Sequence, residues 1–165
     1  MSARPFIDSL DFARNCSEIN GEAPVAGMPR LLEMLENSQG NLGYTLRGGL
    51  DKQGNSWLGI SITGSCRLRC QRCLGALEHP VWIDTRLWLR DQASLDALQD
   101  DDAEFDSILA EERLDVLNLL EEEILLSLPI ALKHEPGACQ VAGGEGGLKE
   151  EKHPFAALAK LKVVK

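Results

Sequence analysis

The chain has 165 residues, enough for one domain with a substantial core and too few for two ordinary domains. Its 44% apolar and 26% charged residues exclude a disordered chain, and no run approaches the roughly 18 apolar residues of a membrane span. The N-terminus lacks the apolar segment of an export signal, so we expect a cytoplasmic protein with no membrane partner. Its five cysteines should then be reduced thiols.

The net charge of −9 is concentrated in one segment. Residues 91–123 carry 13 acidic side chains and one basic side chain, whereas the rest of the chain is close to neutral. An acidic surface is poorly suited to non-specific phosphate binding, which depends on clustered lysine and arginine. The segment is therefore interpreted either as a solvated loop or as a docking surface for a basic partner.

The first part of the chain predicts three short elements. Residues 6–10 are typical of a short strand, and Asp11 is placed to cap a brief helix over residues 12–16. Residues 28–35 place three leucines on one side of a helix. We expect the strand at residues 6–10 to join the main sheet.

Three successive runs alternate apolar and polar residues, which is the period of half-buried strands. They cover residues 42–50, 58–70 and 81–90, with a hairpin turn predicted at residues 51–55. Because short turns connect successive strands, the pattern favours an antiparallel meander.

The strongest helix signal spans residues 115–128, where the apolar side chains form one stripe. Pro129 should end this helix, because proline disfavours helical geometry in the residue before it. The consecutive glutamates at 121–123 point to different sides and are expected to form a solvated helix face. Residues 91–104 have no sustained apolar period and are expected to form a mobile loop.

Together these patterns predict an α+β fold in which an antiparallel sheet meander is packed by a long helix. We expect a single domain over residues 1–135. Residues 136–165 combine a glycine-rich stretch at 143–147 with a basic end, and are expected to form a flexible, extended tail.

Cys70 and Cys73 are separated by two residues, a spacing that lets both sulfurs reach one metal ion. Structural zinc takes four ligands; Cys139 is a candidate third, but Ala142 stands where a second Cys-x-x-Cys pair would end. His134 is placed to donate an imidazole nitrogen instead. Zinc bound by these three cysteines and the histidine is one interpretation. The alternatives are core filling and a thioredoxin-type redox pair, which would need a neighbouring βαβ pattern that the sequence does not predict.

The other two cysteines are not expected to join this set. Cys66 alternates in phase with Ile60 and Leu68, so we expect a buried core thiol. Cys16 has no partner nearby in the sequence and is expected to be buried or half-buried.

Arginines and tryptophans share the polar faces of the second and third strands or follow directly after one of them. These candidates for binding RNA or a protein partner are Arg67, Arg69, Arg72, Arg86, Arg90, Trp82 and Trp88. A sheet face that presents both kinds of side chain can stack bases and hold phosphates. The alternative is that the tryptophans pack beneath the long helix or another strand, which would bury both faces of the sheet.

The sequence assembles no recognisable catalytic motif. It contains neither H-E-x-x-H nor G-x-S-x-G, and the glycine-rich stretch lacks the Lys-Ser/Thr of a phosphate-binding loop. We therefore predict a non-enzymatic protein with no small-molecule substrate.

Read in order, these landmarks resemble the YceD-like family, the large ribosomal RNA subunit accumulation proteins. The landmarks are Cys70-Gln71-Arg72-Cys73, Leu114-Asp115, the block from Glu121 to Ile130, His134 with Cys139, and the closing block from Pro154 to Lys162. The resemblance implies a bacterial cytoplasmic protein needed for normal levels of large-subunit ribosomal RNA, with no known enzymatic activity. Some relatives carry a second Cys-x-x-Cys-Gly where this chain reads Cys139-Gln140-Val141-Ala142-Gly143.

The resemblance therefore implies a ribosome-biogenesis factor that binds a ribosomal RNA precursor or a ribosome-assembly protein. The alternative hypothesis is a zinc-stapled adaptor between proteins that is unrelated to RNA. The acidic segment at 91–123 would serve such an adaptor as a contact for a basic partner.

Overall fold

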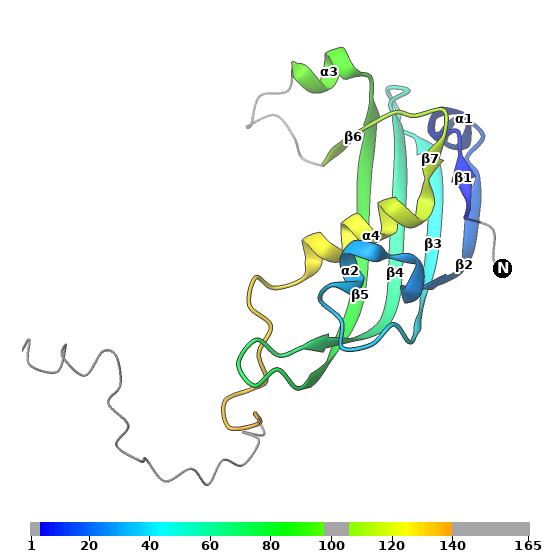
Figure 1. Cartoon of the computed structure of the whole chain (residues 1–165). Coiled ribbons are helices and arrows are strands. Elements are labelled where there is room, and N and C mark those ends of the chain that lie inside the picture. Colours follow the sequence, from blue (N-terminus) through cyan, green and yellow to red (C-terminus); the bar gives the residue numbers. More distant parts are fainter. Residues whose placement is uncertain (1–3, 98–105, 140–165) are drawn as a thin grey trace, which may run out of the picture.

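The computed structural model describes residues 4–97 and 106–139. In chain order its elements are β1 (Phe6–Ile7), α1 (Ser9–Arg14), β2 (Glu18–Pro24), the 3-10 turn η1 (Val25–Gly27), α2 (Pro29–Leu32), β3 (Asn41–Leu50), β4 (Ser56–Arg69), β5 (Ala76–Arg90), α3 (Gln92–Asp96), β6 (Ser107–Leu109), β7 (Leu114–Asp115) and α4 (Val116–Ser127). Figure 1 shows α2 and α4 lying across the same face of a twisted sheet. We call this the inner face.

The main sheet has the strand order β2-β3-β4-β5-β6. Strands β2 to β5 pair antiparallel with their sequence neighbours, whereas β6 runs parallel to β5. The predicted α+β class is confirmed, but the sheet is mixed and not purely antiparallel. The strand predicted at residues 6–10 does not join this sheet; β1 pairs with β7 in a separate two-stranded sheet.

The β3–β4 hairpin turns at residues 51–55, as predicted. The carboxylate of Asp51 accepts hydrogen bonds from the backbone N–H groups of Gln53 and Asn55, at 2.8 and 2.7 Å. Gly54 has a φ of +85°, a left-handed conformation that glycine adopts without a steric penalty. A closed turn of fixed length sets the register of the two strands, and the register decides which side chains face the core.

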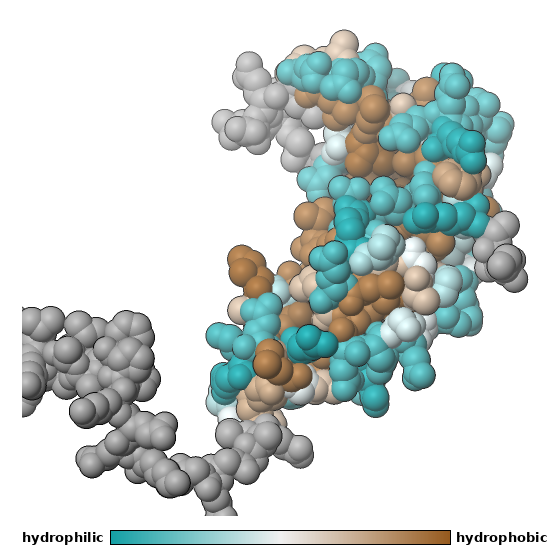
Figure 2. Space-filling model, in the orientation of Figure 1, coloured by the Kyte–Doolittle hydropathy of each residue, from teal (hydrophilic) through white to brown (hydrophobic). Residues whose placement is uncertain are grey.

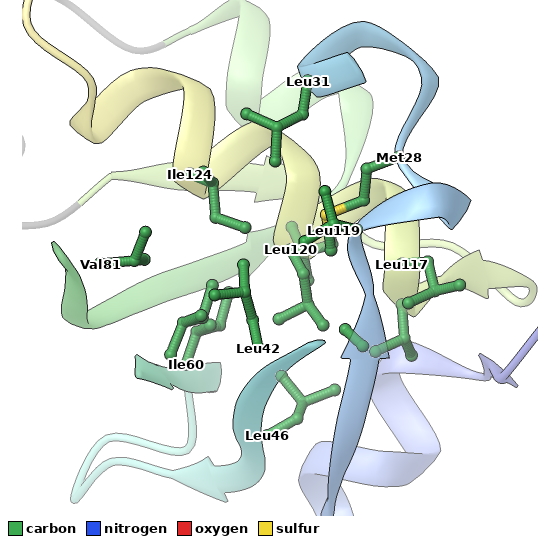
Figure 3. Packing of buried hydrophobic residues seen from close by; sticks show 14 of the residues in the cluster. Met28, Leu31, Leu42, Leu46, Ile60, Val81, Leu117, Leu119, Leu120 and Ile124 are labelled. Carbon is green, nitrogen blue, oxygen red and sulfur yellow. The ribbon is translucent and has the colours of Figure 1, made fainter. Parts of the chain in front are cut away.

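The core lies between the inner face of the sheet and α4 (Figure 3). Leu46, Ile60 and Val81 of three successive strands are buried on this side, and Leu120 and Ile124 of α4 are buried against the sheet. Fully burying one such side chain contributes about 1.5–3 kcal/mol. The alternation of the strands and the stripe of the helix therefore account for the layering.

Helix α4 lies close to the bounds predicted for it. Its N-cap is Asp115, whose carboxylate accepts a hydrogen bond from the Asn118 N–H at 3.2 Å. At Leu128 the backbone has already become extended, directly before Pro129, as expected from the restriction that proline places on its predecessor. With 12 residues the helix has the usual length for a globular protein, and is not unusually long.

Glu121 is buried, with 1% of its surface exposed, so the predicted solvated glutamate face is wrong at this position. One carboxylate oxygen accepts the backbone N–H of Leu31 at 2.9 Å, and the other accepts Nε of Arg30 at 3.1 Å. The sequence prediction failed because both partners belong to α2, 90 and 91 residues earlier in the chain. The carboxylate therefore fastens α2 to α4.

The N-terminal helix and its flanks also differ from the prediction. Asp8, not Asp11, caps α1, because its carboxylate accepts the N–H of Asp11 at 2.9 Å. Cys16 is exposed and has a φ of +48°, since it occupies the turn in which the chain reverses from α1 into β2. The helix predicted at 28–35 is reduced to the four residues of α2.

The predicted loop at 91–104 begins with the short helix α3, which Asp91 caps by accepting the Ser94 N–H at 2.7 Å. Residues 98–105 and the tail predicted beyond residue 139 lie outside the described residues. Among the helices described, none is long and apolar enough to cross a membrane.

Candidate metal centre and outer sheet face

The turn between β4 and β5 presents the first two cysteines together. The N–H of Cys70 donates to the carbonyl of Gly75 at 2.9 Å, and the N–H of Leu74 donates to the carbonyl of Cys70 at 2.8 Å. Leu74 has a φ of +60°, so the chain reverses sharply after Cys73. This tight turn is what the two-residue spacing predicted.

The segment after α4 brings the other two residues to this turn. Leu132 is buried in the core, and its carbonyl accepts the N–H of Gln71 at 2.8 Å. The chain then passes the turn, so that His134 and Cys139 lie beside Cys70 and Cys73. One apolar anchor and one backbone hydrogen bond therefore bring together residues separated by more than 60 positions.

The four ligand atoms lie within 4.8 Å of one another. The sulfurs of Cys70 and Cys139 are 3.8 Å apart, and Nδ1 of His134 lies 3.4 Å from the Cys73 sulfur and 3.7 Å from the Cys139 sulfur. A tetrahedral zinc ion with bonds of about 2.3 Å to sulfur and 2.0–2.1 Å to nitrogen has ligand–ligand edges of about 3.5–3.8 Å. The four residues could therefore hold a metal ion with little rearrangement.

The imidazole of His134 is oriented from its other nitrogen. Nε2 lies 2.9 Å from the backbone carbonyl of Ala76, so it carries the proton and donates this hydrogen bond. Nδ1 then keeps its lone pair and faces the sulfurs. Metal-ligating histidines are commonly held in this way, with the second ring nitrogen donating to a carbonyl or carboxylate.

The sulfurs differ in their affinity for a proton. Hydrogen bonds from backbone N–H groups stabilise the thiolate of Cys70 and lower its pKa to about 5. The N–H of Cys73 has the largest effect, and those of His134 and Arg72 add smaller ones. The pKa of Cys139 is raised, first by burial and then by the neighbouring sulfurs of Cys70 and Cys73. Metal binding requires deprotonated thiols, and a cation among them would offset this repulsion.

The other features of the cysteine prediction have separate outcomes. Cys66 is buried in the core, as predicted, and burial raises the pKa of its thiol. A βαβ-like unit does exist in the parallel pair β5 and β6, contrary to expectation, but β6 pairs with residues 88–90, at the end of β5 far from the cysteine turn. Ala142 lies outside the described residues.

The second candidate region is the outer face, which we define as the face of β2 to β5 opposite α2 and α4. Trp82 lies on it with 79% of its surface exposed, so it does not pack beneath the helix. Arg67, Arg69 and Arg86 are also exposed on this face. One tryptophan and three of the predicted arginines thus share the outer face of β4 and β5, with Arg86 on one side of Trp82 along the strands and Arg67 and Arg69 on the other.

The remaining predicted residues are placed differently. Trp88 is half-buried, and Nε of Arg90 donates to the hydroxyl of Ser107 on β6 at 3.0 Å. Arg72 lies on the cysteine turn instead of the sheet, where its backbone N–H donates to the sulfur of Cys70 at 3.4 Å. Trp88 lies directly opposite Trp57 of β4, Arg90 is the last residue of β5, and Arg72 lies beyond the sheet.

A hollow of about 490 Å³ on the outer face was not predicted from the sequence. Its lining includes Trp57 and Arg47, which were not among the candidates. The guanidinium of Arg86 lies over the indole of Trp57, 4.3 Å from the ring centroid. The sequence does indicate that Trp57 and Arg47 face outward, because they alternate in the same phase as the polar residues of their strands.

Acidic side chains lie among the arginines. Glu18 pairs with Arg47 at 2.6 Å, and Glu78 is directly opposite Arg67 in the register of β4 and β5. Asp84 lies beside the hollow and accepts the hydroxyl of Ser61 at 3.0 Å. A face of mixed charge is better suited to recognising particular groups than to attracting any phosphate backbone.

The fold and the two regions thus define an α+β protein with a candidate Cys₃His metal centre and an open, arginine- and tryptophan-bearing sheet face. A family model described as "Large ribosomal RNA subunit accumulation protein YceD" matches residues 58–162. The match covers more than half of the chain and includes both parts of the metal centre, so the chain belongs to this family. The family is not known as an enzyme family. No solved structure matches the chain.

Proposed function

We propose that the protein is a non-enzymatic ribosome-biogenesis factor that binds a precursor of large-subunit ribosomal RNA through its outer face. The family description supports the ribosomal role. The observation that carries the binding mode is the exposure of Trp82, because an indole open to solvent on a sheet face is a stacking platform for an unpaired base. Exposed arginines on the same two strands supply contacts for the phosphates.

The distribution of charge is consistent with this binding mode. The acidic segment at 91–123 gives the chain most of its negative charge. Three of the 13 acidic residues in this segment, Glu121 to Glu123, belong to α4, which lies on the inner face of the sheet (Figure 1). RNA on the outer face would therefore be separated from the α4 carboxylates by the sheet and the core, and repulsion would fall off within about one Debye length of 8–10 Å.

In the same proposal the four ligands Cys70, Cys73, His134 and Cys139 bind zinc as a structural ion. A set of three thiolates and one imidazole fills all four tetrahedral positions, which is the arrangement of structural zinc and leaves no position for a substrate. The ion would fix the β4–β5 turn to the segment after α4. It would thereby stabilise the end of the sheet that carries Arg67 and Arg69.

A protein-binding adaptor is a second candidate, and a different observation favours it. Ile130 is fully exposed, and Leu126 and Leu74 expose 74% and 69% of their surfaces. Figure 2 views the molecule from the side of α2 and α4 and shows apolar patches among the polar ones on this side. Large exposed apolar side chains of this kind are typical of contacts with another protein.

Crosslinking in growing cells separates the two candidates. Cells would carry the wild-type chain, Trp82→Ala, or Ile130→Ser as the matched surface control, and the captured RNA and protein would be sequenced. The proposal expects large-subunit precursor RNA on the wild type and on Ile130→Ser, reduced several-fold by Trp82→Ala. Capture of protein alone, lost in Ile130→Ser and kept in Trp82→Ala, would favour the adaptor and contradict RNA binding.

A further inference from the structure

The hollow on the outer face has an unusual arrangement of side chains. One row across β3, β4 and β5 consists of Arg47, Gly59 and Arg86, and the next row consists of Thr45, Ser61 and Asp84. Gly59 has no side chain, and the edge of the Trp57 indole lies 3.1 Å from the point where its Cβ would be, so backbone and this ring form the floor between the two arginines. The hollow is thus bordered by two guanidinium groups and by one carboxylate.

Trp57 forms the aromatic wall of the hollow. Its indole fills the space above Gly49, where an added Cβ would overlap the ring, so it lies low against the sheet. The Arg86 guanidinium covers this ring at 4.3 Å from the centroid. Because Arg86 is itself exposed, the outward side of its planar guanidinium is open for a second planar group to stack on it.

The polar groups of the hollow require a ligand that both donates and accepts hydrogen bonds. Asp84 is exposed, and its Oδ1 accepts the hydroxyl of Ser61 at 3.0 Å. Arg47 shares its charge with Glu18, at 2.6 Å, which leaves the hollow close to neutral. A neutral hollow of this kind is not a phosphate trap; it can accept a ligand that offers N–H donors to the carboxylate and acceptors to the arginines.

We infer that this hollow binds a guanine base of a single-stranded RNA. Guanine offers two parallel donors, N1–H and N2–H, to one carboxylate, and on the neighbouring edge it offers O6 and N7, the acceptor pair that arginine recognises. Adenine, cytosine and uracil each offer fewer N–H donors to a carboxylate. The inference rests on the proposed function and deepens it, since it names the base that the outer face recognises.

The ligand is a strand and not a free nucleotide, because the exposed indole of Trp82 lies on the same face beyond Asp84 and can stack a second base. Trp82 is on the same face as Asp84 and two residues away along β5, which is about 7 Å. Its indole is 79% exposed and lies where the base next to the guanine would reach it. A mononucleotide could occupy the hollow but would leave this platform unused.

Binding of the full-length chain to fluorescent ten-nucleotide RNAs tests the inference. The probes are a uridine strand with one central guanosine, the same strand with inosine, which lacks N2–H, and the strand of uridine alone. We expect the guanosine strand to bind about tenfold more tightly than the inosine strand. Asp84→Asn should reduce that ratio to near one without weakening binding of the uridine strand, because it removes a negative charge from the face.

Glu78→Gln is the matched control. Glu78 lies on the same face of the same strand and accepts the hydroxyl of Ser65 at 3.2 Å, much as Asp84 accepts that of Ser61. This variant should keep the tenfold ratio. Equal binding of all three strands by the wild type, or a ratio that survives Asp84→Asn, would overturn the inference while leaving RNA binding intact.

Two further outcomes have separate meanings. Failure to bind any strand would count against the proposed function as well as the inference. Competition with guanosine monophosphate tests whether the hollow binds a guanine within a strand or a free nucleotide. We expect the mononucleotide to displace the guanosine strand only at concentrations far above the Kd of the strand. Equal affinity of the mononucleotide and the strand would assign the hollow to a free nucleotide, contrary to the inference.

Discussion

The sulfur atoms of Cys70 and Cys139 lie 3.8 Å apart although 69 positions separate them in the chain. That distance equals the edge of a tetrahedron around zinc, about 3.8 Å between two thiolates. Bringing two residues this far apart in the chain together costs conformational entropy on folding. The free energy of binding an ion to both residues would offset this cost, because the binding site exists only in the folded protein. Zinc bound at this candidate site would therefore contribute directly to the stability of the protein.

Protein purified without added zinc should contain about one equivalent of the metal. Replacing Cys70 and Cys73 by serine should remove the zinc and lower the melting temperature, because serine does not ligate zinc in place of a thiolate. Elemental analysis and thermal unfolding measure the two effects. Cys16→Ser is the control, since this thiol is exposed and outside the cluster, and it should change neither. A metal-free native protein whose double variant melts unchanged would rule the site out.

The second prediction concerns the attachment of α2 to α4 by Glu121. Glu121→Ala leaves the buried N–H of Leu31 without its acceptor, which should cost about 1–3 kcal/mol in the free energy of unfolding. Glu121→Gln keeps an acceptor and should cost less, because Arg30 is half-exposed and its charge can be solvated. Urea denaturation measures both changes.

Glu122→Ala provides the comparison for this prediction. Glu122 is exposed on the same helix, so its removal should alter stability by no more than about 0.5 kcal/mol. Similar destabilisation by all three substitutions would show that helix propensity, and not the contact with α2, dominates.

Features that depend on short stretches of sequence were predicted, and features that depend on distant contacts were not. The four residues of the candidate metal centre, which the fold brings together, were predicted as a set because the Cys70–Cys73 spacing and the His134–Cys139 spacing are local. Glu121 was misplaced because its partner Arg30 is 91 positions away, and nothing in the helical periodicity distinguishes it from its neighbours. Burial of a charge is a property of the tertiary fold.

The sheet illustrates the same limit. Alternation located β3, β4 and β5, since each strand carries its own period. The three residues of β6 are too few to show a period, and their parallel pairing with β5 depends on the path of the chain between them. The hollow was also missed, because it requires Gly49 and Gly59 to leave space on two adjacent strands around Trp57. Only the register of the strands reveals that coincidence.

A third prediction follows from Glu123, whose pKa is raised, first by burial and then by the charges of Asp106 and Glu122. A carboxyl group with a raised pKa in the folded state binds its proton more tightly there than in the unfolded chain. Its ionisation therefore costs stability as the pH rises through the folded pKa, and no cost remains below the unfolded pKa of 4.5. Glu123→Gln should raise the melting temperature at pH 7 and leave it unchanged near pH 4. An equal rise at both pH values would contradict this origin.

The fourth prediction concerns the close approach of α1 to β3. A Cβ added at Gly48 would lie 2.5 Å from the carbonyl oxygen of Phe12 and 2.7 Å from Cα of Ala13, both backbone atoms that cannot move independently. Gly48→Ala should therefore destabilise the fold by about 1–3 kcal/mol. Gly43→Ala, whose Cβ would be 3.4 Å from the Thr63 hydroxyl, is the control and should be tolerated. Denaturant midpoints of the two variants measure the difference.

The last prediction separates phosphate contacts from base contacts on the outer face. Each phosphate neutralised by an arginine contributes about 0.7 to the slope of log K against log salt for a single strand. Replacing Arg67 and Arg69 by alanine should therefore lower the slope by about 1.4 and weaken all RNA sequences alike. Trp82→Ala should weaken binding at every salt concentration and leave the slope unchanged, because stacking releases no counterions. A slope that falls with Trp82→Ala but not with the arginine variants would mean that the strand follows a different path across the sheet.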